Sequence, residues 1–342
     1  MGTGRRGDSP VTGRVRRSTD RREARPDSGP SGYGVAGYGV AGYAYTPPRR
    51  RRSGGGVLAV GVLGFFALLG IGGAMFVKAT SRTVSTPISS PIAAPPGKKG
   101  NTGSKAAAAD RLYQIGSLPA TGCRGLPIRQ GDPRSFRLFL DATTDCLDNA
   151  WRQGFGQAGM RFSAPQRVFW STPGRSPCGE YPSPGVAAFY CPVNASMYIG
   201  VTDAQRAAGG LPVRYNVAYA REIAHEYGHA IQDLSGILDY SHEARASAPT
   251  LLQRNTVTKR SELQAQCLSG VFMSSVRGSF PIAPGQWGIA LRDSYGRGDN
   301  GRPLDERDHG TNAHYRGWLQ VGYLRGTTSA CNTWAASPPK VS

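Results

Sequence analysis

Acidic residues are scarce in this chain of 342 residues, which has 22 Asp and Glu against 41 Lys and Arg and a formal net charge of +19. On a folded domain, such an excess of positive charge is typical of nucleic-acid-binding proteins. Most of the excess positive charge lies in the first 105 residues. Residues 1–56 hold twelve Arg and only four acidic residues, and residues 57–105 hold five basic residues and no acidic one. The remaining 237 residues carry only +6. The sequence therefore argues against a nucleic-acid-binding core.

Large aliphatic residues are nearly absent from residues 1–56, which are rich in Arg, Gly, Ser and Tyr. A segment of this composition cannot bury enough apolar surface to offset the entropy lost when its backbone becomes ordered. We therefore expect a disordered tail. The alternative is that its tyrosines form a docking motif.

No charged residue occurs in the 21 residues from Val57 to Val77. As a helix they would rise about 31 Å, close to the hydrocarbon thickness of a bilayer. A buried core helix would show a polar face, and a cleaved signal peptide would have a shorter segment before the apolar run. The block of four arginines at 49–52 outweighs Lys78 and Arg82 on the other side. The positive-inside rule then predicts a single-pass membrane protein with a cytoplasmic N-terminus and an extracytoplasmic C-terminal part.

Cysteine is absent before residue 123, and no CxxC pair occurs, which argues against a zinc ribbon or a thioredoxin-like site. All six cysteines follow the predicted span: Cys123, Cys146, Cys178, Cys191, Cys267 and Cys331. An even number confined to the exported side predicts disulfide bonds. Cys178 and Cys191 flank a short segment rich in Gly and Pro and form the pair that the residues favour.

Two regions follow the predicted span. Residues 78–109 are rich in Ser, Pro and Gly and predict an extended linker, and residues 110–336 have a globular composition. Within the globular part, apolar periodicity predicts helices at Phe136–Trp151, Val217–Leu234 and Thr258–Val276, and strands at Arg167–Trp170, Gly185–Tyr190 and Ala195–Val201. We therefore expect an α+β domain that is mainly helical, with a small sheet in its first half.

The helix predicted at 217–234 contains the sequence His225-Glu226-Tyr227-Gly228-His229. Two histidines four residues apart project from one face of a helix, so both imidazoles reach one tetrahedral ion. Glu226 lies about 100° around the helix from His225, where its carboxylate reaches a water on that ion. The pattern predicts a zinc site with Glu226 as general base. The alternative, two solvated surface histidines, fits poorly with a helix that is otherwise apolar.

A catalytic zinc ion needs a third protein ligand. The longer motif with a histidine six residues after the second one is absent, since Ser235 stands there and Gln232 stands at the glycine position. Glu262, on the next predicted helix, is the candidate we favour, although it could instead be an exposed carboxylate near a helix start. His242 and Glu243 are the other candidates, and neither has a helical context that ties it to the site.

Together with the segment Glu262-Leu263-Gln264-Ala265-Gln266-Cys267, the motif at 225–229 resembles the bacterial family described as "putative neutral zinc metallopeptidase", of the gluzincin clan. Further landmarks match in order: Trp151, Ser176-Pro177-Cys178-Gly179, Phe189-Tyr190-Cys191-Pro192, Tyr198, Asp308-His309-Gly310-Thr311, Trp318 and Cys331-Asn332-Thr333-Trp334. The resemblance covers about residues 135 to 335. It implies a zincin-like metallopeptidase domain in which His225, His229 and Glu262 hold one zinc ion and Glu226 is the base. It also implies the disulfides Cys123–Cys146 and Cys267–Cys331.

Two positions depart from the pattern of that family. Gln266 stands where related enzymes tend to have an Asp that orients a zinc-binding histidine, and its amide supplies no negative charge. Tyr315, with Arg316 beside it, stands where the family has an arginine. His309 is a candidate catalytic residue that could donate a hydrogen bond to the oxyanion of the reaction; the alternative is a hydrogen bond within its loop. His314 has no comparable support.

We therefore expect a membrane-anchored zinc endopeptidase that acts on a peptide or protein substrate and contacts the lipid bilayer through residues 57–77. One alternative is a catalytically weak or inactive, zinc-stabilised extracytoplasmic binding or sensor domain, which the neutral Gln266 motivates. A second alternative places the function in the cytoplasmic tail, as an interaction or lipid-binding segment with the exported domain as its sensor.

Overall fold

The computed structural model describes residues 103–183, 186–207, 211, 216–280, 282 and 285–342. The tail predicted at 1–56, the span predicted at 57–77 and most of the predicted linker lie outside these residues. Among the helices of the described residues, none combines the length and the apolar character needed to cross a bilayer. The structure describes the domain that the sequence places after the linker, together with residues 103–109 of the predicted linker. Residues Ser104–Ala108 of that segment form a helix, where an extended chain was expected.

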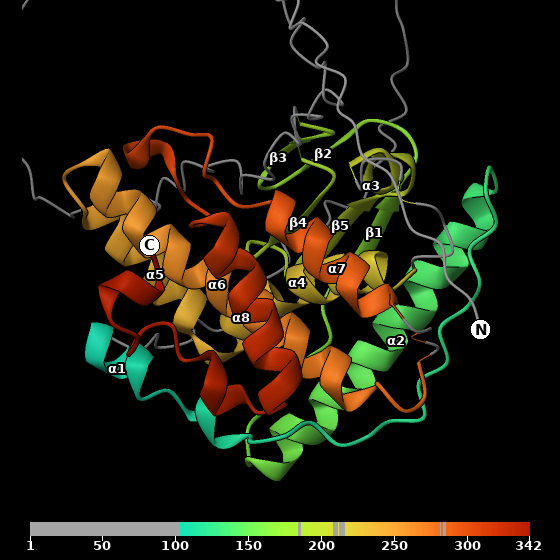
Figure 1. The fold of residues 1–342 in the computed structure, drawn as a ribbon, viewed down its shortest axis with the longest axis horizontal. Coiled ribbons are helices and arrows are strands. Elements are labelled where there is room, and N and C mark those ends of the chain that lie inside the picture. Colours follow the sequence, from blue (N-terminus) through green and yellow to red (C-terminus); the bar gives the residue numbers. More distant parts are fainter. Residues whose placement is uncertain (1–102, 184–185, 208–210, 212–215, 281, 283–284) are drawn as a thin grey trace, which may run out of the picture. The chain divides into compact units, whose positions relative to one another are not determined.

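Helices make up most of the described residues, as predicted (Figure 1). The α-helices are α1 (Ser104–Ala108), α2 (Pro133–Gln157), α3 (Val201–Ala207), α4 (Asn216–Ser235), α5 (Ile237–Ser247), α6 (Leu251–Ser275), α7 (Gln286–Gly296) and α8 (Asn312–Arg325). The short 3₁₀ helices are η1 (Arg111–Gln114), η2 (Leu304–Glu306), η3 (Thr328–Cys331) and η4 (Pro338–Lys340).

The three predicted helices are confirmed as α2, α4 and α6. α4 begins one residue earlier than predicted, whereas α2 and α6 begin three and seven residues earlier. In α2, the Asp132 side chain accepts a hydrogen bond from the backbone N–H of Ser135, and Pro133 takes the first helical position. In α6, Thr250 and Gln253 form a reciprocal capping box. Capping by polar residues thus extends both helices beyond their apolar stretches.

The strands lie between α2 and α4 in the chain: β1 (Gln166–Trp170), β2 (Gly174–Ser176), β3 (Gly179–Tyr181), β4 (Ala188–Cys191) and β5 (Ser196–Gly200). A three-stranded sheet has the order β1-β5-β4, in which β1 is parallel and β4 antiparallel to β5. β2 and β3 form a separate antiparallel pair. The three predicted strands correspond to β1, β4 and β5, so the expected α+β class with a small sheet is confirmed for the described residues.

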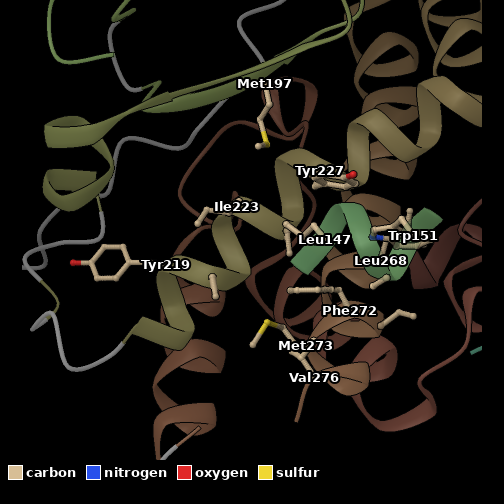
Figure 2. Close-up of a cluster of buried hydrophobic side chains, with 14 of the residues drawn as sticks. Leu147, Trp151, Met197, Tyr219, Ile223, Tyr227, Leu268, Phe272, Met273 and Val276 are labelled. Atoms are coloured by element: carbon tan, nitrogen blue, oxygen red, sulfur yellow. The ribbon is translucent and has the colours of Figure 1, made fainter. Parts of the chain in front are cut away.

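A hydrophobic core joins α2, α4 and α6 (Figure 2). Trp151 of α2, Tyr227 of α4 and Phe272 of α6 belong to this core and are at most 1% exposed. Complete burial of such side chains stabilises a fold by about 1.5–3 kcal/mol each. The helix that carries the two motif histidines is therefore held firmly between its neighbours.

Glycine permits two close helix contacts. In α4, a Cβ added to Gly228 would lie 3.0 Å from both the Cα and the carbonyl oxygen of Ala265 in α6. Between α6 and α8, a Cβ on Gly270 would collide with the backbone of Leu319, and one on Gly322 with the backbone of Cys267. α6 therefore packs closely against both α4 and α8 (Figure 1), and the first of these contacts lies within the histidine motif.

All six cysteines are paired, in the bonds that the sequence and the resemblance predicted. The pairs are Cys123–Cys146, Cys178–Cys191 and Cys267–Cys331. The third bond ties α6, five residues after Glu262, to η3 near the end of the chain.

Candidate metal centre

Three predicted ligands meet where α4 and α6 approach each other. His225 and His229 lie one turn apart on α4, and Glu262 lies on α6. The Oε2 atom of Glu262 is 3.2 Å from Nε2 of His225 and 3.5 Å from Nε2 of His229. These three side chains form a group whose ligand atoms all lie within 4.8 Å of one another. The close contact at Gly228 brings the two helices near enough for this meeting.

The distances suit one tetrahedral ion. Bonds of 2.0–2.1 Å to a tetrahedral zinc ion place neighbouring ligand atoms about 3.3 Å apart, and the two separations of 3.2 and 3.5 Å lie on either side of that value. Nε2 of His229 and Oε2 of Glu262 are buried and have no hydrogen-bond partner. Buried polar atoms without a partner are rare in native proteins. Two imidazoles and a carboxylate are a ligand set that zinc accepts, so these residues fit a single zinc ion.

Both imidazoles have an amide oxygen at their other nitrogen. Nδ1 of His225 is 3.1 Å from Oε1 of Gln266, whose Nε2 donates to the hydroxyl of Ser294 at 2.6 Å. Nδ1 of His229 is 2.9 Å from Oε1 of Gln232. With hydrogen on each Nδ1, the Nε2 lone pairs face Glu262, as metal ligands require. The resemblance led us to expect Gln266 here. Gln232 was not predicted, although its spacing of three residues from His229 puts both on one face of α4.

The ionisation of these groups is strongly coupled. Burial disfavours the charge of His229, yet the Glu262 carboxylate outweighs it and raises the pKa of His229 to about 9. Burial likewise opposes the charge of Glu262, but His229 and His225 hold its pKa well below the usual range. The carboxylate therefore attracts positive charge to the point where the two Nε2 atoms converge. Because metal ligands must be deprotonated, a cation and a proton compete for this point.

Glu226 is buried beside the group and is 5% exposed. Burial raises its pKa to about 8, against the attraction of the His229 and His309 imidazoles. A carboxyl group whose pKa lies near neutral pH is suited to accept and return a proton.

His309 reaches the same place from the loop before α8. Its Nε2 is 3.8 Å from Oε2 of Glu262, and its Nδ1 is 2.8 Å from Oδ1 of Asp308. Asp299 accepts hydrogen bonds from the backbone N–H groups of Asp308 and His309, at 2.8 and 2.5 Å. These contacts fix the loop and direct the His309 imidazole at the centre. Asp299 was not predicted, because it is ten residues away in the sequence and follows no local spacing.

Tyr315, the other departure from the family pattern, lies between two of these imidazoles. Its ring centroid is 5.9 Å from that of His225 and 5.7 Å from that of His309. The neighbouring Arg316 points elsewhere, since its guanidinium lies over the ring of Tyr295. A buried aromatic ring therefore occupies this side of the centre.

The remaining candidates are not part of the three-residue group. His242 and Glu243 lie on α5, where Glu243 is exposed. Nδ1 of His314 lies 2.8 Å from the carbonyl oxygen of Ser342. The structure thus brings Glu262, and neither His242 nor Glu243, to the two histidines.

Comparisons with known proteins identify relatives of this chain and its family. The protein described as "Uncharacterized protein YpfJ" from Escherichia coli is 28% identical over 222 residues, which cover 63% of this chain and 76% of YpfJ. "Uncharacterized protein Rv2575" from Mycobacterium tuberculosis is 28% identical over 225 residues, which cover 57% of this chain and 70% of that protein. No solved structure matches the chain significantly. The family described as "Putative neutral zinc metallopeptidase" matches residues 130–334, which include every residue of the candidate centre, and the chain belongs to this family.

Proposed function

We propose that the chain is a zinc-dependent endopeptidase with a zincin-like domain, in which His225, His229 and Glu262 hold the metal. The observation that carries the proposal is the convergence of three buried ligand atoms, two of which lack any hydrogen-bond partner. When bound, zinc would supply Lewis-acid polarisation of the peptide carbonyl and acidify the attacking water. The chemistry that remains falls to the side chains around it.

Glu226 is the proposed general base. It accepts the proton of the attacking water and returns it to the amine that leaves when the peptide bond breaks. Its burial and its pKa of about 8 support this role, because a proton taken up near neutral pH is also easily given back.

His309 is the proposed oxyanion donor. Its Nε2 lies near Glu262, while Asp308 accepts at Nδ1. With Nδ1 donating to Asp308, Nε2 also carries a hydrogen only when the ring is protonated. Burial disfavours that charge, but Asp308 and Glu262 outweigh it and raise the pKa of His309 to about 9. The imidazolium therefore presents an Nε2–H to negative charge that develops on the substrate carbonyl oxygen.

We further propose that residues 57–77 anchor the enzyme as a single-pass membrane protein, with the metal centre outside the cytoplasm. The uncharged run of 21 residues supports this, as do three disulfides that all follow it. The proposed substrates are therefore peptides or proteins of the extracytoplasmic space.

The decisive test compares wild type with Glu226→Gln in a peptide-library digest, together with zinc analysis of each preparation. We expect the variant to keep stoichiometric zinc and to lose about 10²–10⁴-fold in turnover, as removal of a general base typically costs. Glu180→Gln, at an exposed surface position, is the matched control and should behave as wild type. Equal turnover of wild type and Glu226→Gln would refute the role of Glu226 as the general base.

A second candidate function is a zinc-stabilised binding or sensor domain without turnover. It is favoured by the neutral amides of Gln266 and Gln232 beside the two histidines. An imidazole that is hydrogen-bonded to an amide binds a metal ion more weakly than one hydrogen-bonded to a carboxylate. Stoichiometric zinc without cleavage of any library peptide by wild type would favour this candidate.

A further inference from the structure

The side chain of Gln232 makes four polar contacts in a fully buried position. Its Oε1 faces Nδ1 of His229 at 2.9 Å and accepts from the Ser261 hydroxyl at 3.2 Å. Its Nε2 donates to the carbonyl oxygen of Ser261 at 2.8 Å and to Oε1 of Gln264 at 2.9 Å. The amide therefore uses both of its ends, one toward the metal centre and one away from it.

The orientation of this amide is dictated by its partners. The two ends of a glutamine amide are told apart only by the groups they face. A backbone carbonyl can only accept, so the atom 2.8 Å from the Ser261 oxygen must be the nitrogen. The oxygen must then face His229, whose Nδ1 must carry the hydrogen.

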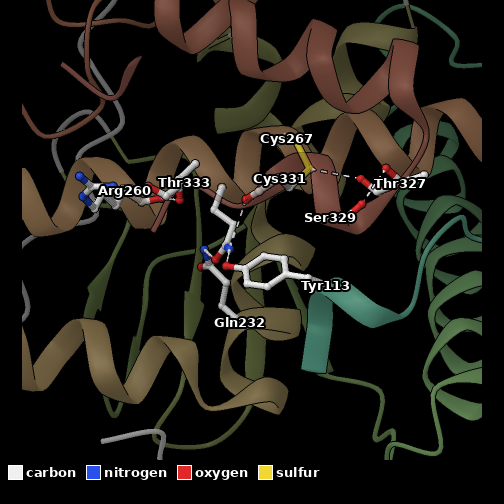
Figure 3. Close-up of a disulfide and its surroundings, with 9 residues drawn as sticks. Tyr113, Gln232, Arg260, Cys267, Thr327, Ser329, Cys331 and Thr333 are labelled. Carbon is white, nitrogen blue, oxygen red and sulfur yellow. Dashed lines mark hydrogen bonds between the residues drawn. A yellow bond between two sulfur atoms is a disulfide. The ribbon is translucent and has the colours of Figure 1, made fainter. Parts of the chain in front are cut away.

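Gln264 continues this order on α6. Its Oε1 accepts from Gln232 and lies 3.4 Å from the indole nitrogen of Trp334, which can only donate. Its Nε2 donates to the Tyr113 hydroxyl at 2.7 Å and to the carbonyl of Cys331 at 3.4 Å. Figure 3 shows Gln232 and the Tyr113 hydroxyl close together beside the Cys267–Cys331 disulfide. Groups of fixed polarity thus orient both amides in the same direction.

We propose that Gln232 and Gln264 are positioning residues that hold His229 in the tautomer with hydrogen on Nδ1 and a lone pair on Nε2. The inference rests on the proposed zinc site. Neither glutamine is a proposed ligand, but both would hold His229 so that its Nε2 can bind the metal. The amide nitrogen of Gln232 is needed for this as much as its oxygen, because the nitrogen fixes which end of the amide faces His229.

The other imidazole provides a contrast within the same molecule. His225 also faces a glutamine oxygen, but the nitrogen of Gln266 meets only the Ser294 hydroxyl. A hydroxyl can rotate to donate or to accept. The Ser294 hydroxyl therefore does not dictate which atom of the Gln266 side chain faces it. If a carboxylate replaced this amide, the hydroxyl could rotate and donate to it.

The test compares zinc dissociation constants of the purified full chain, measured by chelator competition, for wild type, Gln232→Glu and Gln266→Glu. Both substitutions keep the side-chain shape and add a negative charge beside a histidine. We expect Gln232→Glu to weaken zinc binding about 10–100-fold, the usual cost of a disturbed ligand partner, because its carboxylate meets two acceptors, the Ser261 carbonyl and Gln264 Oε1. We expect Gln266→Glu to bind zinc at least as tightly as wild type.

Two other roles for Gln232 predict different results. If it served only as a hydrogen-bond acceptor, both variants would bind zinc more tightly than wild type, and if it served only in packing, both would bind zinc as wild type does. Either result overturns the inference. If Gln232→Glu does not fold, Gln264 carries the test. Gln264→Glu still accepts from Gln232 and Trp334, and its other oxygen can accept from the Tyr113 hydroxyl, although it also faces the Cys331 carbonyl oxygen across the longer 3.4 Å contact. It should therefore bind zinc more tightly than Gln264→Met, which offers no acceptor to Gln232. Equal affinities of these two variants would overturn the inference. Failure of wild type to bind zinc would overturn the proposed function and the inference together.

Discussion

Gly228 sets the distance between the two helices that supply the proposed metal ligands. Its substitution by Ala adds a Cβ that would lie 3.0 Å from the Cα and the carbonyl oxygen of Ala265. Both atoms belong to the backbone of α6, so they cannot move aside as a flexible side chain would. α6 must therefore move away from α4 by a few tenths of an ångström.

The effect on the metal centre follows from where the ligands lie. The two histidines are on α4 and Glu262 is on α6, so the movement lengthens the separations of 3.2 and 3.5 Å directly. Overpacking of this kind costs about 1–3 kcal/mol, against a gain of about 1 kcal/mol because alanine favours helix over glycine. We expect a small net loss of stability, and zinc binding weakened by about tenfold, at the lower end of the cost of a disturbed ligand environment.

The assay is chelator competition for zinc, with urea unfolding of the same preparations. Gly156→Ala is the matched control, since a Cβ at this position in α2 would meet nothing within 4 Å. We expect it to bind zinc as wild type does and to be equally or slightly more stable. If Gly228→Ala also bound zinc with wild-type affinity, the inference that the close contact sets the ligand geometry would be refuted.

Three further predictions concern acid stability, the disulfides and His309. Although burial opposes the charge of Glu222, Arg297 and Arg221 lower its pKa to about 2 from a usual 4.5; this carboxylate therefore stabilises the fold above pH 4.5, by about 3 kcal/mol, and the benefit is lost as the pH falls from 4.5 to 2. The stability difference between wild type and Glu222→Gln in urea unfolding should shrink over that range, and a constant difference would contradict the assignment. Removal of Cys267–Cys331, whose cysteines are 64 residues apart, should destabilise the protein by about 1.4 kcal/mol more than removal of Cys178–Cys191, whose cysteines are 13 residues apart. The reason is that a disulfide closing a longer loop restricts the unfolded chain more. Equal losses of stability would count against this. His309→Gln should lower kcat about 10²–10³-fold with full zinc content, whereas loss of zinc would make His309 a ligand.

The histidine pair could be predicted from the sequence because it depends only on local geometry. Residues 225 and 229 share a helix face in any regular helix, and Glu226 must then lie beside them. Glu262 could not be derived in this way, because its position depends on the packing of α6 against α4 at Gly228. It was favoured because a helix that turns back after a loop can present a Glu to the same ion, and the resemblance to a known family implied the same ligand.

The helices that the sequence analysis missed have weak apolar patterns for a physical reason. In α8, the buried positions are Tyr315, Leu319 and Gly322, and the glycine is there because the backbone of α6 leaves no room for a side chain. A glycine at a buried position interrupts the apolar periodicity from which a helix is predicted.

Gln232 and Gln264 escape prediction for a different reason. They are polar and fully buried, so the spacing of apolar residues does not indicate them.

X-ray absorption at the zinc edge of the zinc-loaded protein reports directly on the ligands of the ion. We expect one ion per chain with two imidazoles and oxygen ligands at about 2.0–2.1 Å, and no sulfur, because all six cysteines are paired. A sulfur shell at about 2.3 Å, or fewer than two imidazoles around the ion, would contradict a centre built from His225, His229 and Glu262.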